Sequence, residues 1–309
     1  SQFRSGFTVV GETSGATATM AFMSTSSMQL MLYDITNGSF LNGEKVYDQD
    51  DGTRYAYLSD LGNPPIVIAK VSGIWNNADG ALTLDGWTTS EFNYIRIYTF
   101  IDDRQVGSWL NTAYRIEATS SNPALDIEES YTEIEGLQVK QGGTGNGVYL
   151  YNTTNIQMSQ CIVGKTDTNY NGSGLAAINQ TNAKIWNNVV YGNYTRNFDL
   201  SGTGDSEIYL YNNTAYGGTT CYYTDNSDTV AINDVGQSCT TNFSGTFHTS
   251  SRNNLSSDDT APGTLSLHDS SIPFFDTASG DFHLRSGADA KDAGYDLSAD
   301  TNLSFTDDI

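Results

Sequence analysis

The sequence repeats one pattern about every two dozen residues between positions 124 and 236. Five stretches align: YTEIEGLQV from Tyr131, NIQMSQCIV from Asn155, NAKIWNNVV from Asn182, EIYLYNNTA from Glu207 and TVAINDVGQ from Thr229. The second and fourth residues of each stretch are mostly apolar or small, which is the alternation of a β-strand. The fourth positions fall at 134, 158, 185, 210 and 232, so the steps are 24, 27, 25 and 22 residues. Such steps are too short for a strand–helix–strand unit and fit one coil of a solenoid.

The predicted fold is therefore all-β, a single-stranded parallel β-helix with a small β module at the N-terminus. Residues 1–62 are short alternating segments divided by Gly, Ser and Asn, which favours an attachment or assembly module of hairpins. Residues 63–245 form the parallel β-helix in this prediction, and residues 246–309 form its loop-rich closing coils.

Stacked coils place the same strand position about 4.8 Å above its counterpart, so the inward Ile, Leu, Met and Val side chains pack on one another. Two Asn pairs, Asn187/Asn188 and Asn212/Asn213, occupy matching places in successive repeats. We expect them at turn corners, where their amides hydrogen-bond along the stack and satisfy loop backbone groups.

The closing sequence DFHLRSGADAKDAG, from Asp281, is similar to the DFHL-x-SGSPAIDAG signature of secreted and viral proteins with the right-handed parallel β-helix of the pectate-lyase-like superfamily. It departs from that signature where Ala-Asp-Ala-Lys replaces Ser-Pro-Ala-Ile. The GETSGATA segment from Gly11 resembles short β modules of phage and other virion structural proteins. These resemblances imply right-handed coils and a protein of the extracellular, cell-surface or virion-surface kind.

The charge of the chain excludes several partners. With 36 Asp and Glu against 14 Lys and Arg, its formal charge of -22 repels phosphate backbones and anionic lipid headgroups, so neither nucleic acid nor a membrane surface is an expected partner. The sequence contains no apolar run of about eighteen residues, so we expect no membrane span. The start SQFRSGFTVV lacks a signal-peptide core, so the chain is expected either to follow a cleaved export signal or to leave its cell in a virus particle.

Three cysteines leave at least one unpaired. Cys221 and Cys239 are the disulfide candidates in an oxidising compartment, although their spacing alone does not establish proximity. Cys161 lies on a repeat strand, where a buried thiol behaves as a small hydrophobic side chain. We expect no metal site and no cofactor from Cys/His clusters, and GTGDSEIYL around Asp205 matches a calcium-binding nonapeptide only in part, which keeps calcium as an open alternative.

The third and fifth repeat positions should share the outer face of one sheet. They are Glu133/Glu135, Gln157/Ser159, Lys184/Trp186, Tyr209/Tyr211 and Ala231/Asn233. Aromatic rings stack on pyranose faces while polar groups bind hydroxyls, so the candidate carbohydrate-binding residues are Trp186, Tyr209, Tyr211 and Lys184. The alternative interpretation is an aromatic ladder sheltered by a loop or by a neighbouring subunit.

A catalytic role requires paired carboxyl groups. Glycoside hydrolysis uses two carboxyls about 5 to 9.5 Å apart, and Glu133 and Glu135 lie two residues apart on one strand face. Asp205 and Glu207 are the further catalytic candidates. Since 36 acidic residues also produce such pairs by chance, the catalytic residues stay unassigned at this stage.

Three functions remain open. The first is a surface structural protein, a fibre, spike or filament subunit, which would be a homo-oligomeric trimer or filament because the open ends of a solenoid must be capped or docked. The second, implied by the resemblance, is a polysaccharide lyase or glycoside hydrolase of the pectate-lyase-like superfamily. The third is a non-catalytic carbohydrate-binding adhesin.

Overall fold

The computed structural model describes residues 7–24, 29–58, 67–91, 93–166, 171–192, 194–202 and 206–305. These residues form strands, turns and loops and no helix, so none of them forms a helix able to cross a membrane. The chain divides into two compact units, one of residues 1–67 with 91–94 and one of residues 68–90 with 95–309. The predicted all-β parallel solenoid with a small N-terminal sheet is confirmed.

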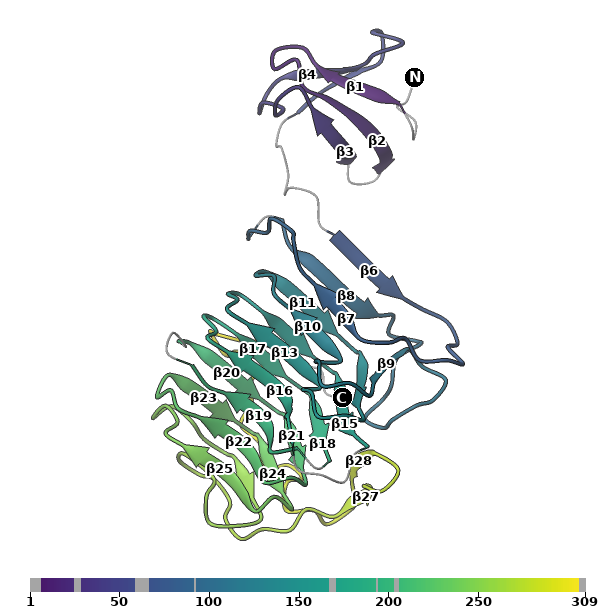
Figure 1. Ribbon diagram of the computed structural model, residues 1–309. Helices are drawn as coiled ribbons and strands as arrows, with labels where there is room; N and C mark the ends of the chain where they lie inside the picture. The colour runs from purple at the N-terminus through teal and green to yellow at the C-terminus, as the bar shows by residue number, and fades with distance from the viewer. Residues whose placement is uncertain are drawn as a thin grey trace. The chain divides into compact units, whose positions relative to one another are not determined.

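The first unit contains one antiparallel sheet of five strands (Figure 1). Its spatial order is β3 (Gln29–Thr36), β2 (Thr17–Ser24), β1 (Thr8–Gly11), β4 (Lys45–Asp48) and β5 (Tyr55–Tyr57). The core consists of small and medium apolar side chains: Val9, Ala16, Ala18, Met20, Phe40 and Val46. The buried Glu44 ties the β1–β2 turn to the β4 strand, because its carboxylate accepts from the backbone N–H groups of Thr13 and Ser14 at 3.1 and 3.0 Å.

The second unit is a solenoid of about eight turns built from three parallel sheets of seven strands. Sheet 1 contains β6 (Val67–Val71), β8 (Ile95–Thr99), β11 (Thr132–Glu135), β14 (Gln157–Ser159), β17 (Lys184–Trp186), β20 (Ile208–Tyr211) and β23 (Thr229–Ile232). Sheet 2 contains β9 (Arg115–Ala118), β12 (Gln138–Gln141), β15 (Ile162–Lys165), β18 (Val189–Tyr191), β21 (Thr214–Tyr216), β24 (Val235–Gln237) and β26 (Leu255–Ser256). Sheet 3 contains β7 (Leu82–Leu84), β10 (Leu125–Ile127), β13 (Val148–Tyr151), β16 (Ser173–Ile178), β19 (Arg196–Leu200), β22 (Thr220–Thr224) and β25 (Thr241–Gly245).

The inward side chains of sheet 1 stack in register as the repeat predicts. Ile134 pairs with Met158, Met158 with Ile185, and Ile185 with Leu210, and all four are buried. Inside sheet 3, aromatic rings make a second stack, with Phe198, Tyr222 and Phe243 4.8 and 4.7 Å apart between successive ring centroids. The core is thus a set of vertical columns, one for each inward strand position.

A two-residue corner joins sheet 1 to sheet 2 in successive coils. Its first residue has a left-handed backbone with φ between 52° and 71°, which Gly and Asn adopt most readily: Gly136, Gln160, Asn187, Asn212, Asn233 and Asn253. The second residue is buried and forms a column of Leu137, Cys161, Asn188, Asn213, Asp234 and Asn254. The expected amide ladder is present, because Asn188 donates both its backbone N–H and its Nδ2 to Asn213 Oδ1 at 3.0 Å.

The C-terminal segment departs in part from the predicted closing coils. Bridges from Arg252 to Thr264 and from Leu255 to Leu267 do add one further layer to the solenoid. Beyond it, however, β27 (Phe274–Asp276) and β28 (Asp281–Leu284) form an antiparallel pair instead of a coil. Phe274 and Phe282 pack with Ile162, Val189 and Leu255 of sheet 2, so this hairpin covers a face of the solenoid.

Candidate functional site

The outer face of sheet 1 carries the two rows of side chains that the repeat predicts. In one row Glu133, Gln157, Lys184 and Tyr209 are neighbours on successive strands, and in the other Glu135, Ser159, Trp186 and Tyr211. All four carbohydrate-binding candidates and the carboxylates Glu133 and Glu135 therefore share one surface, over four consecutive coils.

The predicted register of the last repeat is wrong by one residue. The structure pairs Tyr209 with Val230 and Tyr211 with Ile232. Val230 and Ile232 therefore face outward in place of the predicted Ala231 and Asn233. Thr229 and Ala231 are buried in the solenoid instead. The error has a physical cause: Val230 and Ile232 are apolar because Leu297 and Leu303 cover them.

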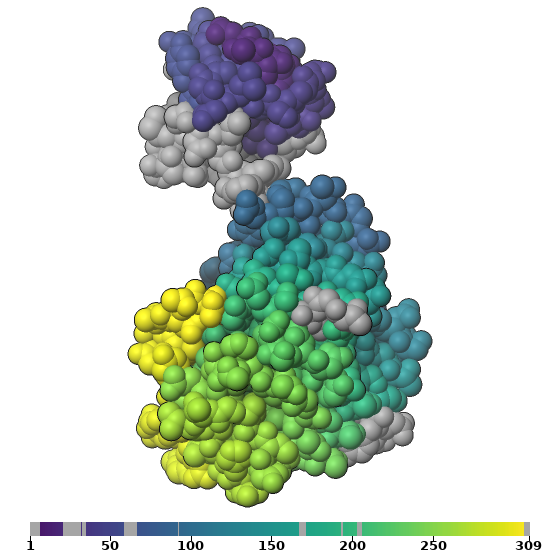
Figure 2. Space-filling view, turned by 90° about the vertical axis from the view of Figure 1, so that its left-hand side faces the viewer, coloured from purple at the N-terminus to yellow at the C-terminus, as the bar shows by residue number. Residues whose placement is uncertain are grey.

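The C-terminal segment 297–305, called the strap here, lies on this part of sheet 1. Leu297 and Leu303 pack with Tyr211, Val230 and Ile232, leaving Tyr211 only 1% exposed. In Figure 2 the C-terminal residues, in yellow, form a layer against the green coils. The sheltered-ladder interpretation therefore describes Tyr211, and the shelter is the chain's own C-terminal segment.

A clamp holds the chain just before the strap. The side chain of the corner residue Asn233 donates to the backbone oxygen of Tyr295 at 2.9 Å and accepts from its N–H at 2.7 Å. The next corner residue, Asn253, donates to the Ala293 oxygen at 3.1 Å. The left-handed corner asparagines thus serve both the solenoid and the segment laid across it.

Beside the strap, sheet 1 has a cavity of about 240 Å³. Its aromatic wall is Trp186 and Phe305, whose ring centroids are 6.3 Å apart. Its remaining lining is chiefly polar: Arg96, Glu133, Ile134, Glu135, Gln157, Ser159 and Gln160. Planar polar groups next to an aromatic wall are a combination suited to a hydroxyl-rich ring.

The two carboxylates of this cavity have different electrostatic surroundings. Glu135 is held between two guanidinium groups, with Arg96 Nη2 at 2.7 Å and Arg104 Nη1 at 2.8 Å from its oxygens. Glu133 is 3.7 Å from Arg96 Nε, and burial raises its pKa; Arg96 opposes this rise and Glu135 adds to it. Two guanidinium groups thus bond Glu135 directly, whereas Glu133 is partly buried and has a raised pKa.

A second cavity of about 420 Å³ lies at the other end of the strap. Residues of sheet 1, the strap and intervening loops line it: Glu207, Tyr209, Tyr211, Asp228, Val230, Ile232, His248, Ser250, Arg252, Tyr295, Asp300 and Asn302. The Arg252 guanidinium lies 4.2 Å from the centre of the Tyr295 ring. Burial raises the pKa of Tyr209, and the carboxylates of Glu207 and Asp300 raise it further.

The catalytic candidates therefore separate. Glu133 and Glu135 share the first cavity, Glu207 lines the second, and Asp205 lies outside the described residues. Sequence reasoning missed Arg96, although extending the alignment by one coil would have found it, since Arg96 pairs with Glu133. Arg104 and Phe305 carry no periodic signal, because a loop and the strap bring them to the site.

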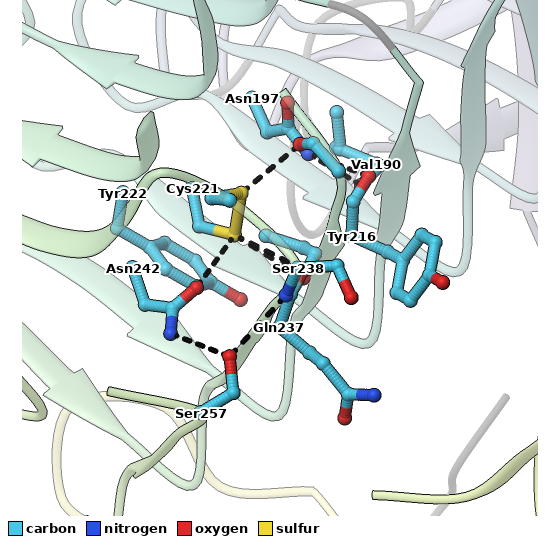
Figure 3. The surroundings of a disulfide bond; sticks show 12 residues. Val190, Asn197, Tyr216, Cys221, Tyr222, Gln237, Ser238, Asn242 and Ser257 are labelled. Carbon is cyan, nitrogen blue, oxygen red and sulfur yellow. Dashed lines mark hydrogen bonds between the residues drawn. A yellow bond between two sulfur atoms is a disulfide. The ribbon is translucent and has the colours of Figure 1, made fainter. Parts of the chain in front are cut away.

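Cys221 and Cys239 form a disulfide with Cα atoms 5.7 Å apart (Figure 3). Cys221 is on β22 and Cys239 is in the turn before β25, the next strand of the same sheet, so the bond joins two successive coils. The Cys221 sulfur lies 3.5 Å from Asn242 Oδ1, and Asn242 donates from Nδ2 to Ser257 Oγ at 2.9 Å. Cys161 is free and buried in the corner column.

Among the described residues no group of three or more His, Cys, Asp or Glu side chains is arranged to hold a metal ion. Comparison of the chain with protein-family models, with curated proteins and with solved structures found no match.

Proposed function

We propose that the chain is a structural subunit of an extracellular, cell or virion surface, similar to the right-handed β-helix proteins of the pectate-lyase-like superfamily, and that it contacts glycans through sheet 1. The observation that carries the glycan contact is the first cavity, where Trp186 and Phe305 face carboxylate, amide and guanidinium groups. Its volume of about 240 Å³ suits one sugar ring better than an extended chain. In this proposal the N-terminal module serves attachment or assembly.

The proposed structural role rests on the stiffness of the solenoid and on the edge strand β7 of its first coil. Coils in register, an internal amide ladder and a disulfide between coils oppose bending of the solenoid. At its first coil, Leu82 is 39% exposed although its register partner Leu125 is fully buried. An edge strand with an exposed core residue favours docking of a second copy, head to tail.

Glycan contact is tested by binding to a glycan array, followed by calorimetry on the ligands found. We expect Trp186→Ala to weaken binding about tenfold or more, because the aromatic wall supplies the stacking surface. Trp87→Ala is the matched control, since Trp87 is 52% exposed and does not line the cavity. Binding that survives Trp186→Ala and Gln157→Ala unchanged would place the sugar elsewhere and reject this site.

Assembly is tested separately by electron microscopy and light scattering over a range of protein concentrations. We expect rods or fibres whose length increases with concentration, because docking of solenoid ends is a bimolecular process. Leu82→Asp should shorten them by placing a charge at the open end. A particle that stays monomeric at the highest concentration contradicts the structural role and leaves the glycan contact to be judged on its own data.

One observation favours a second candidate, glycoside hydrolysis. The raised pKa of Glu133 suits a general acid, and Glu135, bonded to two arginines in the same cavity, is the second carboxyl that such a reaction requires. The glycan panel therefore includes an assay for new reducing ends. Turnover that is lost in Glu133→Gln would establish the enzyme, and binding without turnover would select the non-catalytic protein.

A further inference from the structure

The outer face of sheet 3 carries the same pair of side chains twice. Asp126 on β10 is the register neighbour of Tyr149 on β13, and Asp199 on β19 is the register neighbour of Tyr223 on β22. In both pairs the aspartate precedes the tyrosine by one coil. The clusters formed by the C-terminal segment pack on sheets 1 and 2, and sheet 3 faces the viewer in Figure 1.

The Asp199/Tyr223 pair holds a cation supplied by the chain itself. Arg196 donates from Nη1 to Asp199 Oδ1 at 2.8 Å, and its guanidinium carbon lies 3.4 Å from the centre of the Tyr223 ring. The hydroxyls of Ser201 and Ser173 donate to the same carboxylate at 2.9 and 3.0 Å. Both Asp199 oxygens are therefore hydrogen-bonded.

The Asp126/Tyr149 pair has no such cation. Arg196 precedes Asp199 by three residues, but the residue three before Asp126 is Pro123. The Oδ1 atom of Asp126 is buried without a hydrogen-bond partner, and no Lys, Arg or His among the described residues forms an ion pair with this carboxylate. A buried oxygen without a hydrogen-bond partner costs free energy in the free protein, so a ligand that donated a charged hydrogen bond to it would recover that free energy.

The surroundings of Asp126 and Tyr149 also favour the binding of a cation. The rings of Tyr149 and Tyr151 are stacked at 5.4 Å with an interplanar angle of 14°, and Tyr151 is 39% exposed. Burial raises the pKa of Asp126, and the neighbouring carboxylates of Glu128 and Asp85 raise it further. Since no metal-holding group occurs in the described chain, this geometry suits an organic cation that can also lie over an aromatic ring.

We propose that Asp126 and Tyr149, flanked by Tyr151, bind an arginine side chain of a partner protein in the way that Asp199 and Tyr223 bind Arg196. The guanidinium group would donate to the Asp126 carboxylate and lie over the Tyr149 ring. The partner offers this arginine on a basic segment, because the surrounding face and the chain as a whole are acidic. This site is on a different sheet from the proposed glycan contact and does not depend on it.

The test is an NMR titration of the whole chain with the peptide acetyl-Gly-Arg-Gly-amide, compared with the same peptide carrying citrulline, which keeps the shape of arginine without its charge. We expect saturable shifts at Asp126 and Tyr149 with the arginine peptide alone. The pKa of Asp126 should fall on binding, since an adjacent cation favours the carboxylate. Asp126→Asn and Tyr149→Ala should each weaken binding about fivefold or more, the effect of removing one cation–ring or charge contact of about 1 kcal/mol.

Two further variants separate the site from general acidity and from misfolding. Asp259→Asn removes an exposed carboxylate elsewhere and should leave binding unchanged. Pro123→Arg places a guanidinium where Arg196 stands in the filled pair, and it should abolish peptide binding with the thermal unfolding midpoint maintained. Equal binding of the arginine and citrulline peptides, or binding unchanged in both Asp126→Asn and Tyr149→Ala, would overturn the proposal.

Discussion

Replacement of Asp234 by Asn is expected to stabilise the protein at neutral pH by about 1–3 kcal/mol, the cost of leaving one buried polar group unsatisfied. Asp234 is fully buried in the corner column, where every neighbour that follows Cys161 is Asn. Its Oδ1 accepts from the N–H and the Nδ2 of Asn213 at 2.8 and 3.0 Å, but its Oδ2 has no partner.

The asparagines of the corner column show which hydrogen bonds an amide would make at position 234. Asn188 donates from Nδ2 to the Met158 oxygen at 3.0 Å, Asn213 to the Ile185 oxygen at 2.9 Å, and Asn254 to the Ala231 oxygen at 2.8 Å. The backbone carbonyl that occupies the corresponding place beside Asp234 is that of Leu210, the register neighbour of Ile185 and Ala231. An Asn side chain would donate from Nδ2 to the Leu210 carbonyl. An ionised Asp instead places its Oδ2, which cannot donate, beside that carbonyl oxygen.

The stabilisation should depend on pH in a defined direction. Burial raises the pKa of Asp234 well above its ordinary 3.8, although the bonds from Asn213 oppose the rise. The folded state therefore holds this proton more tightly than the unfolded state, so the contribution of Asp234 is fully present below about pH 3.8 and is lost as pH rises toward its folded-state pKa. The free energy of unfolding of Asp234→Asn should accordingly exceed that of the wild type by a margin that grows from acid to neutral pH.

Urea denaturation at several pH values measures this margin. Asp259→Asn, an exposed carboxylate, is the control and should change stability by less than about 0.5 kcal/mol at any of them. A margin independent of pH would show that Asp234 has the same pKa in the folded and unfolded states, and our account of its proton would then be wrong.

Removal of the disulfide should destabilise the protein by about 3 kcal/mol, since the bond closes a loop between cysteines 18 residues apart. We expect the double variant Cys221→Ala/Cys239→Ala to lower the urea midpoint by the corresponding amount. The loss should arise in the last coils, because the bond joins β22 to the turn before β25.

Reductant provides the control for this experiment. It should lower the midpoint of the wild type to that of the double variant and leave the double variant unchanged. Cys161 does not complicate the result, because it is buried and burial raises its pKa to about 12. A wild type with the same midpoint in both conditions would indicate that this bond contributes nothing to stability.

Part of the candidate site could be read from the sequence and part could not. The two outward rows from Glu133 to Tyr211 follow from alternation along a strand and from the repeat length, because each parallel coil repeats the register of the previous one. The prediction of outward residues failed at Val230 and Ile232, because a strand covered on both faces no longer alternates between apolar and polar residues. The same reason explains why the apolar residues Ile162 and Val189 of sheet 2 point toward the closing hairpin.

The sequence by itself determined the solenoid, its coil length, the corner asparagines and the outward side chains of sheet 1 from Glu133 to Tyr211. These features follow from local rules, since strand alternation and left-handed corners involve residues near one another in the chain. Only the tertiary structure decided that the strap covers Tyr211, that Arg104 and Phe305 complete the first cavity, and that Asp126 lacks the cation that Asp199 has. These contacts join residues from separate coils, loops and the strap. They could not be predicted from the repeat, because the loops and the strap do not follow its spacing.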